Sequence, residues 1–138
     1  MRPIADIGAR LELLSTADLG PAAAEELLSL AEQTLEHWVT GRGVAPTQER
    51  REGFRLLALH RQGCRNLPSF NACRETCREI AYHYNLLKLP ADREQAVRHA
   101  RMMALLVNHL LLFVVGKMQV EGLGEFCCSS RPLRQEAG

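Results

Sequence analysis

The chain has few aromatic residues and no excess of either charge. Phe, Trp and Tyr make up 5% of its 138 residues and apolar residues 46%, which predicts a core built from aliphatic side chains. Seventeen Lys and Arg face sixteen Asp and Glu, so no global field would hold the protein on nucleic acid or on an anionic membrane. We therefore expect nucleic acid not to be its partner.

Targeting and membrane-spanning segments are not found either. The first residues, MRPIADIGARLELL, lack the apolar run and the cleavage site of a secretory signal, which predicts a cytoplasmic protein. The longest apolar run, at residues 102–116, is shorter than the roughly 20 residues that span a bilayer, and it contains Asn108 and His109. Such a run is typical of a buried helix, so we expect no membrane span.

The sequence has none of the common catalytic signatures. It contains no nucleophilic triad pattern and no glycine loop of the kind that cradles phosphate. Its five histidines form neither H-E-x-x-H nor the repeated E-x-x-H pairs of di-iron bundles. These absences favour a binding role over an enzymatic one.

What the chain does contain is helical periodicity throughout, whereas no alternation of apolar and polar residues is long enough for a strand. We predict a single-domain, all-α bundle of four to five helices over residues 1–121. The helices are expected at residues 3–15, 21–40, 47–61 and 70–89, and from Asp92 to Val120. Residues 122–138, broken by Gly, Ser and Pro, are expected to form a flexible or loosely docked tail.

Helix boundaries follow from capping patterns. Thr47 is a suitable N-cap for the third helix, and Gly63 is expected to end it. Asp92 followed by Gln95 resembles a capping box and opens the long fifth helix.

The fifth helix is apolar on nearly every side from Val97 onward, which predicts a central position and a homodimer formed through it. Asn108 and His109 are expected to be buried there, either bonding within the core or a dimer interface, or binding a small ligand. His83, in the fourth helix, is a third candidate for a buried polar residue.

Cysteines supply the first candidate site. In FNACRETCREIAYHYN, residues 70–85, Cys73 and Cys77 are four apart and share a helix face with Phe70, Ile80 and Tyr84. This spacing favours plain core packing, and no cofactor is predicted. The alternatives are a reactive thiolate, favoured by neighbouring arginines, or a soft metal ion or iron–sulfur cluster. The further ligands would then be Cys64, with Cys127, Cys128, His83 or His109.

Charged residues supply the second candidate site. Arg74 and Arg78 are four apart, as are Glu75 and Glu79, so each pair sets like charges together. Arg51 and Arg55 are expected to pair with these glutamates. The arginines could instead bind an anionic ligand or an acidic partner.

From these patterns we expect a small cytoplasmic adaptor, regulator or assembly factor. It would bind a protein partner through its Arg/Glu-rich third and fourth helices. The alternative is a cysteine-dependent module for metal, cluster or thiol redox chemistry. That module would use Cys64, Cys73 and Cys77, with Cys127 and Cys128 as further candidates.

Overall fold

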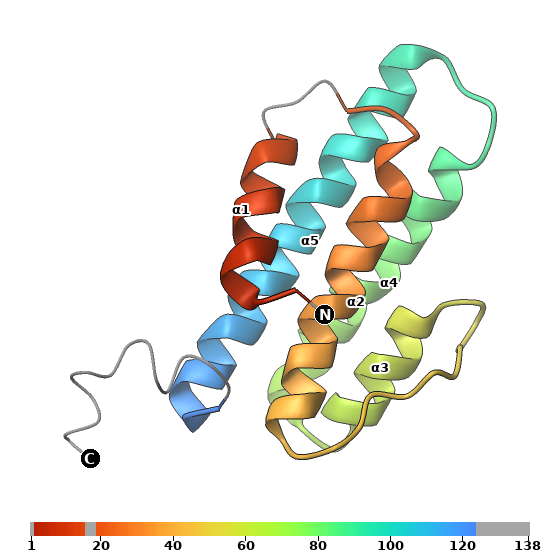
Figure 1. The fold of residues 1–138 in the computed structure, drawn as a ribbon. Coiled ribbons are helices and arrows are strands. Elements are labelled where there is room, and N and C mark those ends of the chain that lie inside the picture. The colour runs from red at the N-terminus through yellow and green to blue at the C-terminus, as the bar shows by residue number, and fades with distance from the viewer. Residues whose placement is uncertain (1, 16–18, 124–138) are drawn as a thin grey trace.

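The computed structural model describes residues 2–15 and 19–123, and within them the chain forms five α-helices and no strand (Figure 1). The prediction of an all-α bundle with a long C-terminal helix is confirmed. The elements are α1 (Ile4–Ser15), α2 (Ala23–Gly41), α3 (Arg55–Cys64), the 3₁₀ turn η1 (Pro68–Phe70), α4 (Asn71–Leu87) and α5 (Arg93–Glu121).

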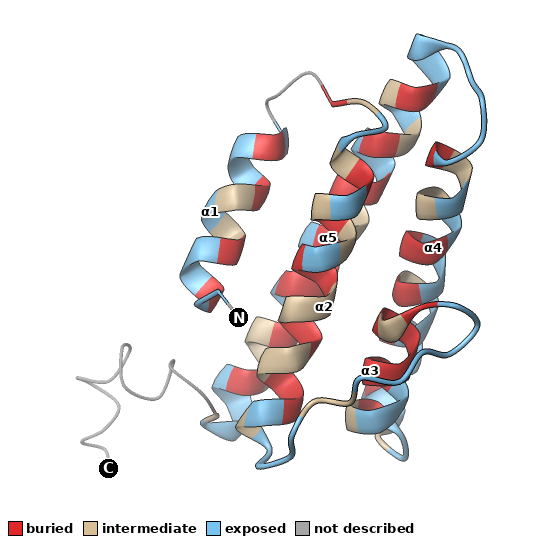
Figure 2. Cartoon of the chain, turned by 45° about the vertical axis from the view of Figure 1, so that its right-hand side comes forward, coloured by how far each residue is buried: buried red, intermediate tan, exposed pale blue. Residues whose placement is uncertain are grey.

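α5 is the central helix of the bundle, because α1, α2 and α4 all pack against it. The short α3 contacts α2 and α4 at one end of the molecule (Figure 1). Buried residues recur along the inner sides of the helices and enclose one continuous hydrophobic core (Figure 2). The bundle therefore holds α3 and the start of α4 on a rigid base.

Several local predictions are confirmed. Ile4, Ile7, Leu11 and Leu14 form the buried face of α1. The side chain of Asp92 accepts a hydrogen bond from the backbone N–H of Gln95 at 2.8 Å and so caps α5. α5 ends at Glu121, and the φ of 65° at the next residue, Gly122, lies in the left-handed region that favours glycine.

The predicted start of the third helix is wrong, because α3 begins at Arg55 and Thr47 caps no helix. Glu52 and Gly53 have φ angles of 55° and 88°, which no helix can contain. Arg51 and Phe54 on either side exchange backbone hydrogen bonds of 2.9 and 3.0 Å. Because of this turn, the helix cannot begin before Arg55, and residues 44–54 form a loop beside it.

Gly63 does not end α3, which continues to Cys64. It instead lets α3 approach α2 closely, since a Cβ atom on residue 63 would lie 2.8 Å from Cγ2 of Val39 and 2.9 Å from Cδ1 of Trp38. The indole Nε1 of Trp38 donates a hydrogen bond to the Gly63 carbonyl at 2.8 Å. The glycine is therefore required by packing.

The core is aliphatic along most of its length but contains a small aromatic cluster near α3. The ring centroids of Trp38 and Phe70 are 4.8 Å apart, and those of Phe70 and Phe113 are 5.0 Å apart. Trp38 and Phe70 are almost fully buried. Three of the chain's aromatic residues thus gather where α2, η1 and α5 meet.

The prediction that Asn108 and His109 are buried is wrong, because both lie on the exposed face of α5. That face also carries Leu105 and Leu112, whose exposed fractions are 64% and 63%, whereas Leu110 is fully buried. A 3.6-residue period places positions 105, 108 and 112 together on the outer side. Leu110 therefore belongs to the core of one chain.

Among the described residues, α5 is the one helix long and apolar enough to cross a membrane. In its most apolar 18-residue window, 39% of the residues are buried inside the bundle. Length and composition alone do not distinguish such a helix from the core helix of a bundle.

Candidate functional site

Three cysteine thiols converge between the end of α3 and the first turns of α4. Cys64 is the last residue of α3, and Cys73 and Cys77 lie on the inward face of α4. All three are free and buried, with exposed fractions of 4%, 5% and 0%. Cys73 and Cys77 shift each other's pKa values, and the charge of Cys73 raises the pKa of Cys64. Cys127 and Cys128 lie outside the described residues.

His60 joins these thiols, and sequence reasoning did not single it out. It is buried on α3 and lowers the pKa of Cys73. Its Nε2 lies 3.2 Å from the carbonyl oxygen of Phe70, and since a carbonyl only accepts, Nε2 carries a proton there. The spacing of His60 and Cys64, four residues apart on one helix, was the available signal.

The surroundings of the three thiols favour the ionisation of one of them over the ionisation of all three. The hydrogen bond from Cys77 lowers the pKa of Cys73 below its ordinary value, against the opposing effect of burial. The hydrogen bond and charge of His60, and the charge of His109, lower it further. The same hydrogen bond raises the pKa of Cys77, and burial raises the pKa of Cys64. Cys73 is therefore the thiol that ionises first.

The thiols do not meet the geometry of a metal centre. Within the described part of the chain, no three His, Cys, Asp or Glu side chains are placed to hold a metal ion. Thiol ligands bind as thiolates, and the raised pKa values of Cys64 and Cys77 oppose a second and a third ionisation.

A basic pocket opens beside the thiols, between α3 and the start of α4. Its volume is about 230 Å³, and no Asp or Glu of the described residues lines it. His60 and Cys64 of α3 line it. Asn66, after α3, and Asn71, the first residue of α4, line it as well. Leu57 and five arginines also line it, and we call it the arginine pocket: Arg51, Arg61, Arg65, Arg74 and Arg78.

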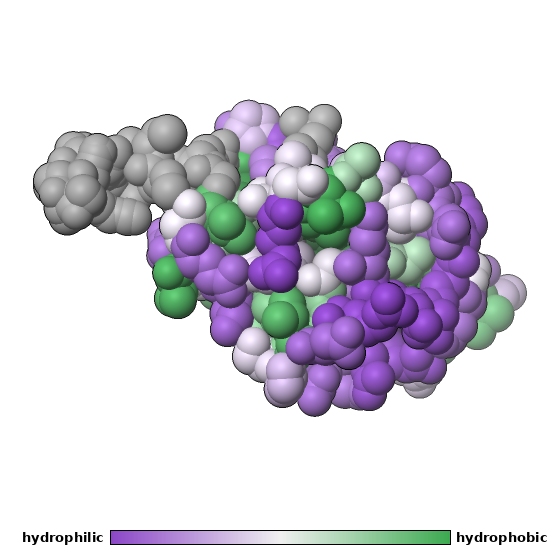
Figure 3. Space-filling view, turned by 90° about the horizontal axis from the view of Figure 1, so that it is seen from below, coloured by the Kyte–Doolittle hydropathy of each residue, from purple (hydrophilic) through white to green (hydrophobic). Residues whose placement is uncertain are grey.

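The end of the bundle at which α3 lies is strongly hydrophilic when seen from below (Figure 3). A second surface pocket, of about 360 Å³, adjoins the arginine pocket and shares Arg51, Arg61 and Arg65 with it. Glu49 is the one acidic residue in that second lining. The basic surface thus extends along α3 beyond a single concavity.

Two arginines of the pocket have carboxylate partners at its rim. Both Nη atoms of Arg78 bond the two oxygens of Glu52 at 3.1 Å, a bidentate ion pair. Nη2 of Arg74 lies 3.6 Å from Oε2 of Glu75, and both side chains are about 60% exposed. Both pairs are exposed to solvent, so each contributes little to folding.

The other three arginines of the pocket differ. The guanidinium groups of Arg51, Arg61 and Arg65 make no hydrogen bond or ion pair within the part of the chain that the structure describes. Each is exposed at the surface. The N–H groups of these three guanidinium groups therefore have no hydrogen-bond acceptor among the described residues.

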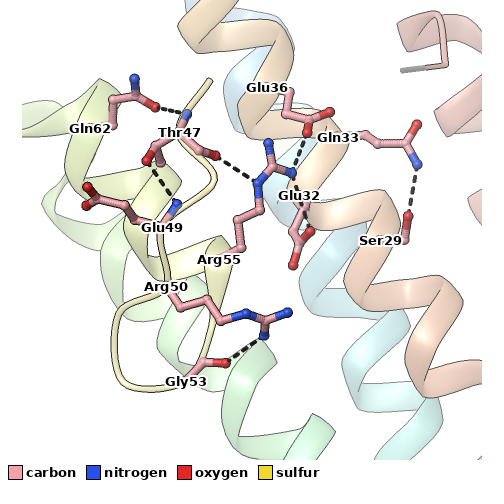
Figure 4. A network of polar contacts seen from close by, with 10 residues as sticks. All are labelled: Ser29, Glu32, Gln33, Glu36, Thr47, Glu49, Arg50, Gly53, Arg55 and Gln62. Carbon is pink, nitrogen blue, oxygen red and sulfur yellow. Dashed lines mark hydrogen bonds and ion pairs between the residues drawn. The ribbon is translucent and has the colours of Figure 1, made fainter. Parts of the chain in front are cut away.

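Arg55 does not belong to this site, and its predicted pairing with Glu75 and Glu79 is wrong. It is bound within the fold by Glu36 and, at 3.6 Å, by Glu32 of α2 (Figure 4). Its Nε donates to the Thr47 carbonyl at 2.8 Å, which ties the 44–54 loop to α2. Its side chain is only 16% exposed, so it is not available to a partner.

His83 and Glu79 lie apart from the thiols. Nδ1 of His83 is 3.3 Å from Nδ1 of His99 on α5, and burial, followed by the charge of His99, lowers the pKa of His83. Glu79 is exposed on α4 and acts on His83 only through its charge. His83 is half-buried, so the prediction that it is a buried polar residue is only partly right.

Comparison with known proteins gives no match: no family model, no curated protein and no solved structure matches the chain.

Proposed function

We propose that the protein is an interaction module of the adaptor, regulatory or assembly-factor type, which binds an acidic segment of a partner protein at the arginine pocket. The observation that carries the proposal is the set of three guanidinium groups, on Arg51, Arg61 and Arg65, that face the pocket without an acceptor among the described residues. Arginine forks bind carboxylates and phosphates through two parallel hydrogen bonds, which gives both affinity and orientation.

The attachment of α3 to α2 supports a binding role. Arg61 lies on α3 and Arg65 follows its last residue, and α3 is held to α2 by Arg55 and by the contact of Gly63 with Trp38. A surface whose backbone is fixed before binding loses less entropy when a partner arrives. The glutamates at the rim, Glu52 and Glu75, would repel an acidic segment that binds out of register.

The experiment compares two matched double variants. Arg61→Gln with Arg65→Gln removes two exposed arginines of the pocket, and Arg98→Gln with Arg101→Gln removes two exposed arginines of α5. Each protein, and the wild type, is immobilised and exposed to cell extract at low salt, and bound proteins are quantified. The partner is expected with wild type and the α5 variant, and lost with the pocket variant.

A recovered protein supports the proposal only after reconstitution with purified components. Its affinity should fall as salt rises, because exposed charge pairs are screened. If no purified protein distinguishes the pocket variant from the α5 variant, the pocket is not a protein-binding site and the proposal fails.

A second candidate function is thiol chemistry at Cys73, favoured by its hydrogen bonds with Cys77 and His60. A thiolate stabilised in this way is the reactive form of cysteine, although burial limits its access. Elemental analysis and a visible spectrum of anaerobically purified protein would test metal or cluster binding. Thiol alkylation of wild type and Cys73→Ser would test reactivity. A bound metal or a fast Cys73-dependent reaction would support this second candidate without contradicting the adaptor proposal. If the protein has no bound metal, no cluster and no fast Cys73-dependent reaction, the second candidate is removed.

A further inference from the structure

We propose that the arginine pocket binds a phosphomonoester dianion, carried by a phosphorylated segment of the partner protein. This inference rests on the proposed function and names the chemical group that the pocket takes. It follows from the number of guanidinium groups around one small volume, the absence of acidic residues among the described residues that line it, and the polar groups between them.

Charge is the first argument. Arg78 is neutralised by Glu52 and Arg74 is partly neutralised by Glu75, which leaves the charges of Arg51, Arg61 and Arg65 without a counterpart among the described side chains. A carboxylate brings one negative charge and two acceptor oxygens. A phosphomonoester brings a charge of about −1.5 to −2 at neutral pH and three acceptor oxygens. Three open guanidinium groups match the second ligand better than the first.

The remaining lining groups are compatible with an anion. Burial raises the pKa of the Cys64 thiol, so it stays protonated and adds no negative charge to the pocket. Asn66 and Asn71 bring amide groups that can donate hydrogen bonds. Asn71 is also the first residue of α4, where the helix dipole adds positive potential.

Size is the second argument. The pocket volume of about 230 Å³ is several times the roughly 30 Å³ that one water molecule occupies in the liquid. It therefore has room for a phosphoryl group together with the side chain that carries it. Its opening to solvent, where Arg61 and Arg65 are exposed, allows a protein segment to approach.

Nucleic acid fits the pocket less well, although it also offers phosphates. Single strands are bound by basic grooves in which bases stack on aromatic rings. Within residues 2–15 and 19–123, no Phe, Tyr or Trp lines the arginine pocket, and the chain as a whole has a formal charge of only +1.

The test uses the full chain and labelled peptide libraries that differ at one fixed central position: phosphoserine, serine or glutamate. Binding is followed by fluorescence anisotropy for wild type, for Arg61→Gln with Arg65→Gln, and for Arg98→Gln with Arg101→Gln as the control. Inorganic phosphate is added as a competitor, and a labelled single-stranded oligonucleotide is a separate probe. Circular dichroism confirms that the variants are folded.

We expect the phosphoserine library to bind wild type and the control about tenfold or more tightly than the glutamate library, and inorganic phosphate to compete. The pocket variant should lose this preference. Equal binding of the phosphoserine and glutamate libraries would overturn the inference and leave the acidic-partner proposal standing. An oligonucleotide that binds more tightly than the phosphoserine library would overturn it as well.

One further outcome separates the inference from the proposed function. If inorganic phosphate binds and depends on Arg61 and Arg65 while no peptide library binds, the assignment of a phosphate group to the pocket is supported. The proposed role in binding a partner protein is then contradicted. If neither phosphate nor any library binds wild type more tightly than the pocket variant, the inference is overturned.

Discussion

α3 carries arginines in two contrasting environments, Arg55 at its start and Arg61 and Arg65 in and just after its last turn. Arg55 points to α2, where Glu32 and Glu36 bind it in a half-buried position. Arg61 and Arg65 are exposed beside a pocket to whose lining the described part of the chain contributes no carboxylate. The residue type is the same, so the neighbouring helix decides whether an arginine stabilises the fold or remains available for a ligand.

The largest effect is expected from Arg55→Ala, which should lower the free energy of unfolding by about 2–3 kcal/mol. It leaves the half-buried carboxylates of Glu32 and Glu36 without their cation and removes the donor to the Thr47 carbonyl. Burial already raises the pKa of Glu32, and without Arg55 that pKa should rise further. Urea unfolding measures the change in stability, with Arg61→Ala as the matched control. Equal losses of unfolding free energy in the two variants would show that Arg55 and Arg61 do not differ in their contribution to the fold.

The next effect tests whether the contrast depends on the close approach of α3 to α2. Gly63→Ala should destabilise the protein by about 1–2 kcal/mol, because its Cβ would clash with Val39 and Trp38. Tryptophan fluorescence should report the displaced indole. Gly116→Ala on α5 is the control, since no atom lies within 4 Å of a Cβ there, and helix propensity predicts a gain of about 0.5–1 kcal/mol. A neutral Gly63→Ala would show that α3 does not need this contact.

A third prediction concerns the thiols beneath the pocket. The pKa of Cys73 lies below the value of about 8.5 for an unfolded cysteine, so its ionisation stabilises the fold above that pH. This contribution is lost as pH falls through the folded pKa. Cys64 and Cys77 have raised pKa values, so their contributions are complete below about pH 8.5 and are lost as pH rises through their folded pKa values.

Thiolate absorbance measures this order of ionisation in a protein that carries Cys127→Ser and Cys128→Ser. One thiol should ionise well before the other two, and Cys73→Ser should remove that first step. Three thiols that titrate together near the ordinary value would contradict the proposed hydrogen bond between Cys73 and Cys77.

The smallest change in stability is expected for the pocket arginines, whose replacement should have the largest effect on ligand binding. Arg61→Gln with Arg65→Gln should change the free energy of unfolding by less than about 0.5 kcal/mol, because neither side chain has a partner among the described residues. Chemical unfolding measures this value at low and at high salt. A clear loss of stability would mean that the two arginines stabilise the fold and are not free for a ligand.

Much of the fold could be predicted from local sequence patterns. The faces of α1 and α4, the cap at Asp92 and the glycine at the end of α5 depend on spacing within one helix. The start of α3 could not be predicted in this way, because Glu52 adopts a positive φ that its residue type does not favour. The outward position of Asn108 depends on which face of α5 the other helices cover.

The candidate site was predicted only in part. The convergence of Cys64, Cys73 and Cys77 follows from helical spacing and a short connection. The roles of Arg55 and Arg61 could not be separated, because the carboxylates that bind Arg55 come from α2, about 20 residues earlier in the chain. Homodimer formation through α5 stays a prediction, and Leu105 and Leu112 are leucines that this helix exposes.

The most direct measurement follows the side-chain Nε–Hε resonances of the arginines by nuclear magnetic resonance while inorganic phosphate is added. The signals of Arg61 and Arg65 should shift along a common saturating curve, because both guanidinium groups face the pocket. The signal of Arg55, bound by Glu32 and Glu36, and that of Arg98 on α5 should stay in place. Equal, unsaturated shifts of all exposed arginines would contradict a phosphate site in the arginine pocket.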